Sequence, residues 1–395
     1  MTDGPQLRRV QGADIEAVES DKVLVDAIRK EIEANGPMTF ARFMERALYE
    51  PDHGYYRSGD GRPGRSGDFL TAPEAHPIFG RSIARFAVSS WAALGRPSPF
   101  TVREYGAGGG ALAEALLGAV ATDAPDLAGV IRYRPDEIEP RRVDELAGRL
   151  AAAGLGGFLE ADDREPIVGL AIGNEILDAL PTHRVVLRQD RLREVLVGWQ
   201  DGAFVDVEGD PSTPTLAHRL EAEGIRLTEG QPAEVCLAVD GWIAAAAAGV
   251  ERGVLLLIDY GDTADRLYDP RRRPAGTLLA YLRHRAHGDL YRAMGRQDLT
   301  AHVDVTAVEA AATAAGLAHL GTTTQSRFLA ALGAGELLVE LQAGPASALP
   351  GYLEARAALV RMIDPAAMGS FKVMAFGRGL APRAVLRGFE DSSDA

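Results

Sequence analysis

The sequence predicts an α/β protein built on a doubly wound, mostly parallel sheet. From residue 100 onward, short apolar segments with strand character alternate with segments whose apolar residues recur at helical spacing, and this alternation is typical of βαβ units. Residues 254–260 are mostly apolar, as expected for a central strand that is buried on both faces. The chain has 395 residues and is 46% hydrophobic, so it can form a large packed core.

Helices are expected before the sheet. In residues 21–35 the apolar side chains recur at helical spacing, and Thr39 can cap a second helix. A loop rich in Gly, Ser and Pro at 57–67 precedes a further helix. We therefore expect an N-terminal helical lobe over residues 1–95.

The core of the sheet is expected over residues 96–265. Turn-forming residues separate its elements, and residues 199–232 are polar enough to form an excursion from the sheet. The expected order is a strand at 100–105, a helix at 111–120, a strand at 131–138, a helix at 141–153, a strand at 167–172, one or two strands within 184–198 and a strand at 254–260.

Two further segments complete the chain. Residues 266–304 contain many basic residues and little periodicity, so we expect an inserted loop or lid. Residues 305–395 are expected to complete the fold with helices, a final strand near 371–376 and a frayed end. The expected helices span 305–315, 326–332 and 349–363.

Composition excludes several functional classes. With 42 basic and 56 acidic residues the net charge is −14, so the uniformly basic surface of a nucleic-acid-binding protein is absent. Cys236 is the only cysteine, which excludes an intrachain disulfide and favours a reducing compartment, so we expect a cytoplasmic protein. Residues 1–30 are too acidic for a transit peptide and lack the apolar core of a secretory signal. No apolar stretch approaches the roughly 20 residues that span a bilayer, so no membrane insertion is expected.

No metal site is expected. His284, His287 and His302 are the histidines that come closest to a cluster in the chain. Their spacing matches no standard zinc template.

The strongest local motif is a glycine run between an expected strand and an expected helix. Residues 104–110 have the spacing E-x-G-x-G-x-G, with glycines at Gly106, Gly108 and Gly110. Glycine allows a sharp turn and lets the backbone approach a ligand that a Cβ atom would obstruct. A dinucleotide oxidoreductase would require G-x-G-x-x-G, which this loop does not have. An ordinary tight turn without a ligand is the simpler alternative.

The glycine run resembles the cofactor loop of class I S-adenosylmethionine-dependent methyltransferases. This resemblance implies S-adenosyl-L-methionine as cofactor and a Rossmann-like methyltransferase fold. It places Glu104 near the cationic amino-acid end of the cofactor. A second carboxylate, at the end of the next strand, is implied to accept hydrogen bonds from the ribose hydroxyls, and Glu137 occupies that position.

Further motifs resemble, in order, those of the MidA-like group of methyltransferases, over residues 22–376. The chain differs from the family pattern at Ala107, Gly109, Ala111 and Glu139. The resemblance implies methylation of a protein arginine during assembly of respiratory complex I, and a protein partner with a basic segment; a homodimer is also possible. The matching segments are 67–74, 79–80, 104–110, 173–181, 257–261, 276–278, Tyr281, His284 and 298–304.

Candidate catalytic residues follow the strand at 167–172. A guanidinium stays protonated and delocalised, so carboxylates that hold it and remove a proton are expected. Glu175 is the first candidate, with Asp178 second and Asn174 beside them. Alternatively, Asn174 and Asp178 only cap the following turn.

The segment 67–74 has two interpretations. The family resemblance implies that it forms a wall of the cofactor or substrate pocket, with Gly67, Asp68 and Thr71 as cofactor-binding candidates. Alternatively, its polar residues only cap the following helix.

Three functions therefore remain open. The first is methylation of a protein side chain, with arginine implied by resemblance. The second is methylation of a small molecule on the same scaffold, and the third is a non-catalytic assembly factor. Transfer of a labelled methyl group, followed to a protein or a small-molecule fraction, distinguishes them.

Overall fold

The computed structural model describes residues 18–58, 71–160, 165–345, 349–381 and 386–390. Its main sheet has six strands in the order β15-β16-β9-β4-β2-β3. Strand β2 pairs in parallel with β3 on one side and with β4 on the other, and β4 pairs in parallel with β9. Strand β16 is antiparallel to both of its neighbours, β9 and β15. The strands are β2 (Phe100–Tyr105), β3 (Ile131–Asp136), β4 (Ile167–Asn174), β9 (Val250–Asp259), β15 (Ala318–Thr324) and β16 (Lys372–Arg378).

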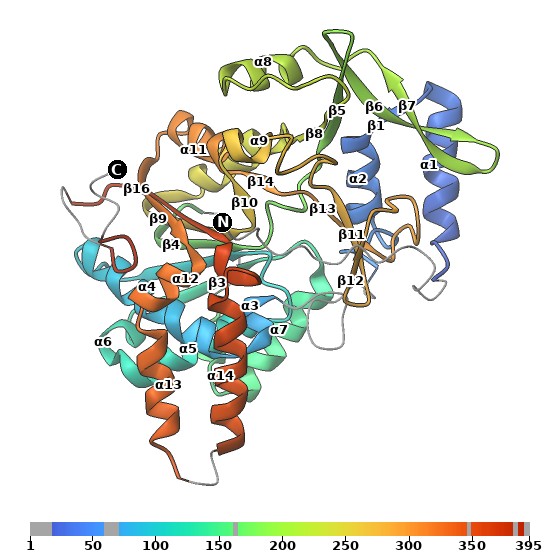
Figure 1. Cartoon of the computed structure of the whole chain (residues 1–395). Coiled ribbons are helices and arrows are strands. Elements are labelled where there is room, and N and C mark those ends of the chain that lie inside the picture. The colour runs from blue at the N-terminus through green and yellow to red at the C-terminus, as the bar shows by residue number, and fades with distance from the viewer. Residues whose placement is uncertain (1–17, 59–70, 161–164, 346–348, 382–385, 391–395) are drawn as a thin grey trace.

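Helices cover both faces of this sheet, which confirms the predicted doubly wound α/β fold (Figure 1). Along β9, Leu256 and Ile258 face α4, α5 and α7, whereas Leu255 and Leu257 face α9 and α11. This alternation explains the continuous apolar run, because both faces of a central strand are buried. The helices are α4 (Ile78–Ala93), α5 (Ala111–Asp123), α7 (Pro140–Ala152), α9 (Ala238–Ala248) and α11 (Val305–Ala314).

Pro135 is tolerated because β3 forms the edge of the six-stranded path. A proline removes one backbone donor, which an edge strand can lose without breaking a ladder on its outer side. On its outer side β3 forms a bridge from Tyr133 to Leu159, the one bridge that the described residues show there.

A second lobe is built from strands and helices that are distant in sequence. Its five-stranded sheet has the order β1-β6-β5-β8, with β7 also paired to β6. Helices α1 (Lys22–Asn35) and α2 (Phe40–Tyr49) pack against this sheet and against residues of the 278–301 segment in one apolar cluster. The sheet strands are β1 (Met38–Thr39), β5 (His183–Arg188), β6 (Arg191–Gln200), β7 (Ala203–Gly209) and β8 (Pro232–Val235).

The segment expected to be an inserted loop contains a small antiparallel sheet of the order β12-β11-β13. Its strands are only three or four residues long, so they lack the periodicity by which a sequence predicts a strand. Long-range packing against α2 holds them in place. The strands are β11 (Leu279–Leu282), β12 (Arg285–His287) and β13 (Asp298–Thr300).

Within the described residues, the C-terminal part from residue 305 contains four α-helices, α11 to α14, and the strands β15 and β16 of the main sheet. Helices α13 and α14 form a hairpin that extends away from the body of the protein (Figure 1). The domain boundaries at 95, 265 and 304 stay predictions. Within the described ranges, every helix is too short or too polar to cross a bilayer. The remaining elements are α3 (Ala72–Ala75), α6 (Pro125–Ala128), α8 (Thr215–Ala222), α10 (Ala264–Leu267), α12 (Gln325–Ala331), α13 (Ala334–Gln342), α14 (Leu349–Ile363), β10 (Gly261–Asp262) and β14 (Val303–Asp304).

Candidate active site

The two groups of predicted site residues meet at one edge of the main sheet. The chain leaves β2 to form β3 on one side and returns to form β4 on the other side of β2. Ligands of open α/β sheets bind at such a switch point, outside the carboxyl ends of the strands. The glycine loop 106–110 follows β2, and residues 174–178 comprise the last residue of β4 and the turn after it. The topology therefore brings the two predicted groups together.

The three glycines of the loop have different surroundings. All three have positive φ, of 65° at Gly106, 52° at Gly108 and 80° at Gly110. A Cβ at Gly106 would lie 2.8 Å from Ile176, and one at Gly110 would lie 2.8 Å from Leu146. A Cβ at Gly108 would meet no atom within 4 Å. Gly106 and Gly110 therefore allow close packing, whereas Gly108 borders open space, as a backbone cradle for a ligand requires.

Glu137 lies directly against this loop. Its Oε2 accepts a hydrogen bond from the Gly108 N–H at 2.8 Å, and its Oε1 accepts one from the Glu139 N–H at 3.1 Å. A carboxylate offers about four acceptor positions, so Glu137 is oriented by the backbone and retains capacity for ligand hydroxyls. The neighbouring Ile138 is an apolar side chain with 47% of its surface exposed. A nucleoside offers a sugar whose hydroxyls can donate to the Glu137 carboxylate and a flat base that can pack against the apolar Ile138 side chain.

Glu104 lies beneath the glycine loop and is only 5% exposed. The Tyr133 hydroxyl donates a hydrogen bond of 2.5 Å to its Oε2. Burial raises the pKa of Glu104 to about 8; the charge of Glu137 also raises it, and the bond from Tyr133 opposes the shift. Glu104 is therefore mostly protonated at neutral pH in the protein without a ligand.

Glu175 follows β4 in a turn with φ of 53°. Its Oε1 accepts hydrogen bonds from Asn174 Nδ2 at 3.1 Å and from the Ala72 N–H at 3.3 Å. Burial raises the pKa of Glu175 to about 8, the charge of Asp178 contributes, and the two hydrogen bonds oppose the shift. Among the described residues, Asn174 Oδ1 is a buried atom without a hydrogen-bond partner.

Asp178 lies three residues further along the same turn and is 6% exposed. Burial raises its pKa to about 6, and a hydrogen bond from the Tyr260 side chain opposes the shift. The groups that donate to Glu175 and Asp178 are neutral: an amide, a tyrosine hydroxyl and backbone N–H groups. Carboxylates in a site of low solvent exposure whose donors, among the described residues, are all neutral favour a cationic ligand, because its charge would stabilise their ionised forms.

Asp259, at the end of β9, fixes the turn that carries these residues. Its Oδ2 accepts hydrogen bonds from the backbone N–H groups of Ile176, Leu177 and Asp178 at 3.1, 2.8 and 3.3 Å. Burial and the charges of Asp178 and Glu175 raise the pKa of Asp259, while its backbone donors oppose the shift. Asp259 therefore has the turn-stabilising role that the sequence allowed for Asn174 and Asp178.

The start of α3 also approaches the site. Thr71 occupies the position before α3, but its side chain makes no capping hydrogen bond. The next residue, Ala72, donates its N–H to Glu175. This contact places the start of α3 beside the catalytic candidates. Gly67 and Asp68 lie outside the described residues.

Sequence reasoning missed several polar residues that border this site. The charges of Asp178 and Asp298 raise the pKa values of Tyr56 and Tyr281, after the larger effect of burial. Tyr281 and Asp298 stood within family-like motifs without an assigned role. Tyr56 had no local signal, because its nearness to the site depends on packing between distant segments.

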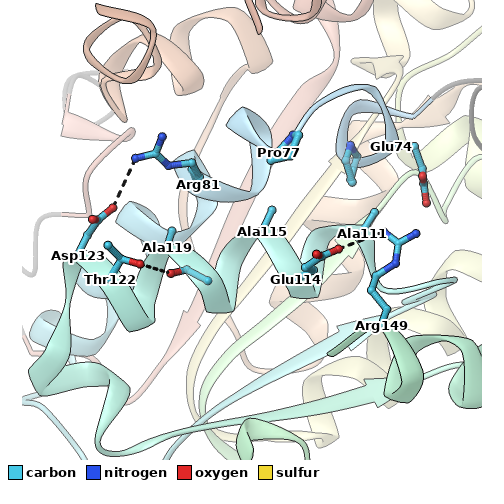
Figure 2. A pocket seen from close by; sticks show the side chains of 12 residues that line it. Glu74, Pro77, Arg81, Ala111, Glu114, Ala115, Ala119, Thr122, Asp123 and Arg149 are labelled. Atoms are coloured by element: carbon cyan, nitrogen blue, oxygen red, sulfur yellow. Dashed lines mark hydrogen bonds and ion pairs between the residues drawn. The ribbon is translucent and has the colours of Figure 1, made fainter. Parts of the chain in front are cut away.

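A separate groove of about 520 Å³ lies between the start of α4 and α5 (Figure 2). Arg149 pairs with Glu114 at 3.5 Å on one side, and Arg81 pairs with Asp123 at 3.7 Å on the other. Neither the three loop glycines nor Glu137, Glu175 or Asp178 line it. This groove is therefore distinct from the candidate active site.

Comparison with curated proteins shows several relatives. The chain is 29% identical to "Protein arginine methyltransferase NDUFAF7 homolog, mitochondrial" of Drosophila melanogaster. This match extends over 392 residues and covers 90% of this chain and 85% of the relative. It is 26% identical to "Protein arginine methyltransferase NDUFAF7, mitochondrial" of Xenopus tropicalis, over 80% of this chain and 76% of the relative.

A solved structure and a family model agree with this similarity. A COG1565 superfamily protein of Burkholderia thailandensis, solved with bound S-adenosyl-homocysteine, is 34% identical with a TM-score of 0.82, covering 94% of this chain and 95% of that one. The model of the family described as "Putative S-adenosyl-L-methionine-dependent methyltransferase" matches residues 82–323. The chain belongs to this family of S-adenosyl-L-methionine-dependent methyltransferases, the MidA-like group that its motifs resemble.

Proposed function

We propose that the protein methylates an arginine side chain of a protein substrate. The single observation that carries this proposal is the pair Glu175, half-buried, and Asp178, buried, two carboxylates held by neutral donors at the carboxyl edge of the sheet. A cationic guanidinium satisfies both the charge and the hydrogen-bonding capacity of such a pair. The names of the curated relatives, which describe protein arginine methyltransferases, support the same substrate class.

The glycine loop and Glu137 are the proposed cofactor-binding residues. S-adenosyl-L-methionine supplies an electrophilic sulfonium methyl group. The open space at Gly108 admits a ligand against the backbone, and Glu137 is oriented to accept hydrogen bonds from ribose hydroxyls. Glu104 and residues Gly106 to Gly110 line the proposed cofactor site on the side of the sheet. Thr71 lies on the segment beside Glu175, and we include it with Gly67 and Asp68 as a proposed pocket wall.

Glu175 and Asp178 have different proposed roles. Asp178, whose pKa is raised by burial and lowered by the hydrogen bond from Tyr260, is proposed to hold the guanidinium by charge. Glu175, with a pKa of about 8, is poised to accept the proton that the attacking nitrogen loses. Asn174 orients Glu175 through its amide. Holding the nitrogen in line with the methyl group contributes up to roughly 7–11 kcal/mol to such reactions.

The proposed partner is a protein with a basic segment, such as a respiratory complex subunit. We place the reaction in the cytoplasm, because the only cysteine, Cys236, suits a reducing compartment. The names of the curated relatives carry the word mitochondrial.

The proposal also includes a homodimer. Helix α14 has four exposed apolar side chains on the face opposite to its buried residues. The intervals between these four residues are nearly the same when the helix is followed in either direction. Two copies of α14 packed in antiparallel orientation would therefore bring the first exposed apolar residue of one copy beside the last of the other. Sedimentation velocity of the wild type and of Leu353→Glu tests this pairing, which a monomeric wild type would contradict. The four residues are Leu349, Leu353, Val360 and Ile363.

The experiment that tests the proposed function uses S-adenosylmethionine with a labelled methyl group. The protein is incubated with a lysate of cells that lack it, and the labelled fraction is hydrolysed and its amino acids separated. We expect label in methylarginine. Label in a small-molecule fraction or on another amino acid, or no transfer at all, would reject the proposal.

The pH dependence of catalysis is expected to report the ionisation of Glu175. Burial raises the pKa of Glu175 to about 8, so below this pH the residue holds a proton and cannot accept another. We expect kcat/KM for the acceptor to rise by up to about tenfold per pH unit between about pH 6 and 8 and then to level off. Steady-state kinetics of the wild type and of Glu175→Gln measure this. Equal slopes in the two proteins would show that another group titrates.

A further inference from the structure

A further buried carboxylate, that of Asp298, lies on a chain segment that is hydrogen-bonded to the turn of the catalytic candidates. Asp298 is the first residue of β13 and is 2% exposed. The hydroxyl of Tyr56, which follows α2, donates a hydrogen bond of 2.9 Å to its Oδ1. Asp298 also lies opposite Tyr281 in the pairing of β13 with β11. Three segments that are distant in sequence therefore converge on this carboxylate.

Asp298 and Asp178 act on the same tyrosines. The backbone N–H of Ala301, just after β13, donates to the Asp178 carbonyl oxygen at 2.9 Å, so the two acidic residues lie on chain segments that are bonded together. Both charges raise the pKa of Tyr56, and both, together with Glu175, raise the pKa of Tyr281, in each case after burial. Asp298 therefore lies on a segment that is bonded to the turn of Asp178, and its charge acts on the same two tyrosines.

Aromatic rings complete this region. The rings of Tyr49 and Tyr56 are stacked, with centroids 5.6 Å apart and an interplanar angle of 23°. The Tyr49 hydroxyl donates to the carbonyl oxygen of Ala179, next to Asp178, at 3.0 Å. Burial and the charges of Asp298, Asp178 and Glu137 raise the pKa of Tyr49. The tyrosine pair thus connects Asp298, through Tyr56, with the residue next to Asp178, through Tyr49, and aromatic faces attract cations.

We propose that Asp298 binds the cationic side chain of the substrate and that Tyr56 is the positioning residue that orients Asp298. This inference rests on the proposed function and deepens it. A guanidinium presents several N–H donors in one plane. Glu175 faces the nitrogen that receives the methyl group, while Asp178 and Asp298 accept hydrogen bonds from the other N–H groups of the guanidinium. An ammonium group is a compact point charge and matches three separated acceptors less well.

The test uses Nα-acetyl-arginine amide and its neutral analogue Nα-acetyl-citrulline amide as probes. Calorimetry in the presence of S-adenosyl-homocysteine measures the affinity of each probe for the wild type, Asp298→Asn and Tyr56→Phe. Tyr291→Phe and Asp206→Asn are matched controls, because Tyr291 donates to Asp206 in a similar pair outside the site.

We expect the wild type to prefer the arginine probe. Asp298→Asn should weaken its binding by about tenfold or more, because one partner of a buried charge pair is lost, and Tyr56→Phe by about threefold. Citrulline binding, S-adenosyl-homocysteine binding and both controls should stay unchanged. A merely structural role of Tyr56 would lower the thermal midpoint without changing the arginine-to-citrulline ratio.

Two kinds of failure are distinguishable. If the wild type prefers arginine and Asp298→Asn does so equally, the role of Asp298 is wrong and the proposed function stands. If the wild type binds citrulline as strongly as arginine, or binds neither, the proposed function and this inference are both rejected.

Discussion

Gly108→Val is expected to abolish S-adenosylmethionine binding and to leave the protein folded. A Cβ at Gly108 would have no protein atom within 4 Å. The valine side chain is therefore expected to clash with the bound ligand and not with the rest of the protein. Its φ of 52° lies in the left-handed region, where a β-branched side chain adds some strain. We expect a loss of affinity of about 100-fold or more, which corresponds to about 2.7 kcal/mol. Calorimetric titration with S-adenosylmethionine measures it, and circular dichroism checks the fold.

The neighbouring glycines serve as matched controls for this prediction. Valine at Gly110 would collide with Leu146, and valine at Gly106 with Ile176, so both variants should lose about 1–3 kcal/mol of unfolding free energy through overpacking. Glu137→Gln keeps the shape of the side chain but removes its charge and one acceptor oxygen, and should also weaken cofactor binding. Wild-type affinity in folded Gly108→Val would contradict the proposed position of the cofactor.

Glu175→Gln is expected to lower kcat/KM by a factor of about 10² to 10⁴, the usual range for a lost general base. Glutamine has nearly the same shape, so the hydrogen bonds from Asn174 Nδ2 and the Ala72 N–H can be kept by its carbonyl oxygen. It cannot accept the proton that the methylated nitrogen loses. Single-turnover methyl transfer to the acceptor identified by the labelling experiment measures the effect, at saturating S-adenosylmethionine.

Cofactor affinity and fold separate this effect from general damage. Glu175→Gln should bind S-adenosylmethionine as tightly as the wild type, because Glu175 lies on the substrate side of the site. Asp259→Asn, by contrast, should lose thermal stability together with activity, because Asp259 holds three backbone N–H groups of the turn. Full activity of Glu175→Gln would leave the general-base role without support.

Much of the main sheet could be predicted from the sequence. The boundaries of β2 agree with the predicted strand at 100–105, and β3, β4, β9 and β16 lie where apolar segments predicted strands. These strands are buried on one or both faces, so their composition carries a strong pattern. The glycine loop was also predictable, since a strand, a glycine run and a helix follow one another directly in the chain.

Elements that depend on distant partners could not be predicted. Strand β15, at the edge of the main sheet, contains three consecutive threonines and one glycine, and β11, β12 and β13 are too short to show a period. The packing of α1 and α2 on the second lobe likewise has no sequence signature. An amphipathic helix shows which face is buried but not what covers it.

The sequence by itself determined the strands β2, β3, β4, β9 and β16 in their order along the chain, the backbone freedom of the glycine loop and the acidic residues at the strand ends, because each of these depends on a run of consecutive residues. Only the tertiary structure decided which glycine borders open space, that Asp259 holds the turn of Glu175 and Asp178, and that Tyr56 and Asp298 join them. The physical reason is that burial, and with it the ionisation of a carboxylate, is set by atoms contributed from distant parts of the chain.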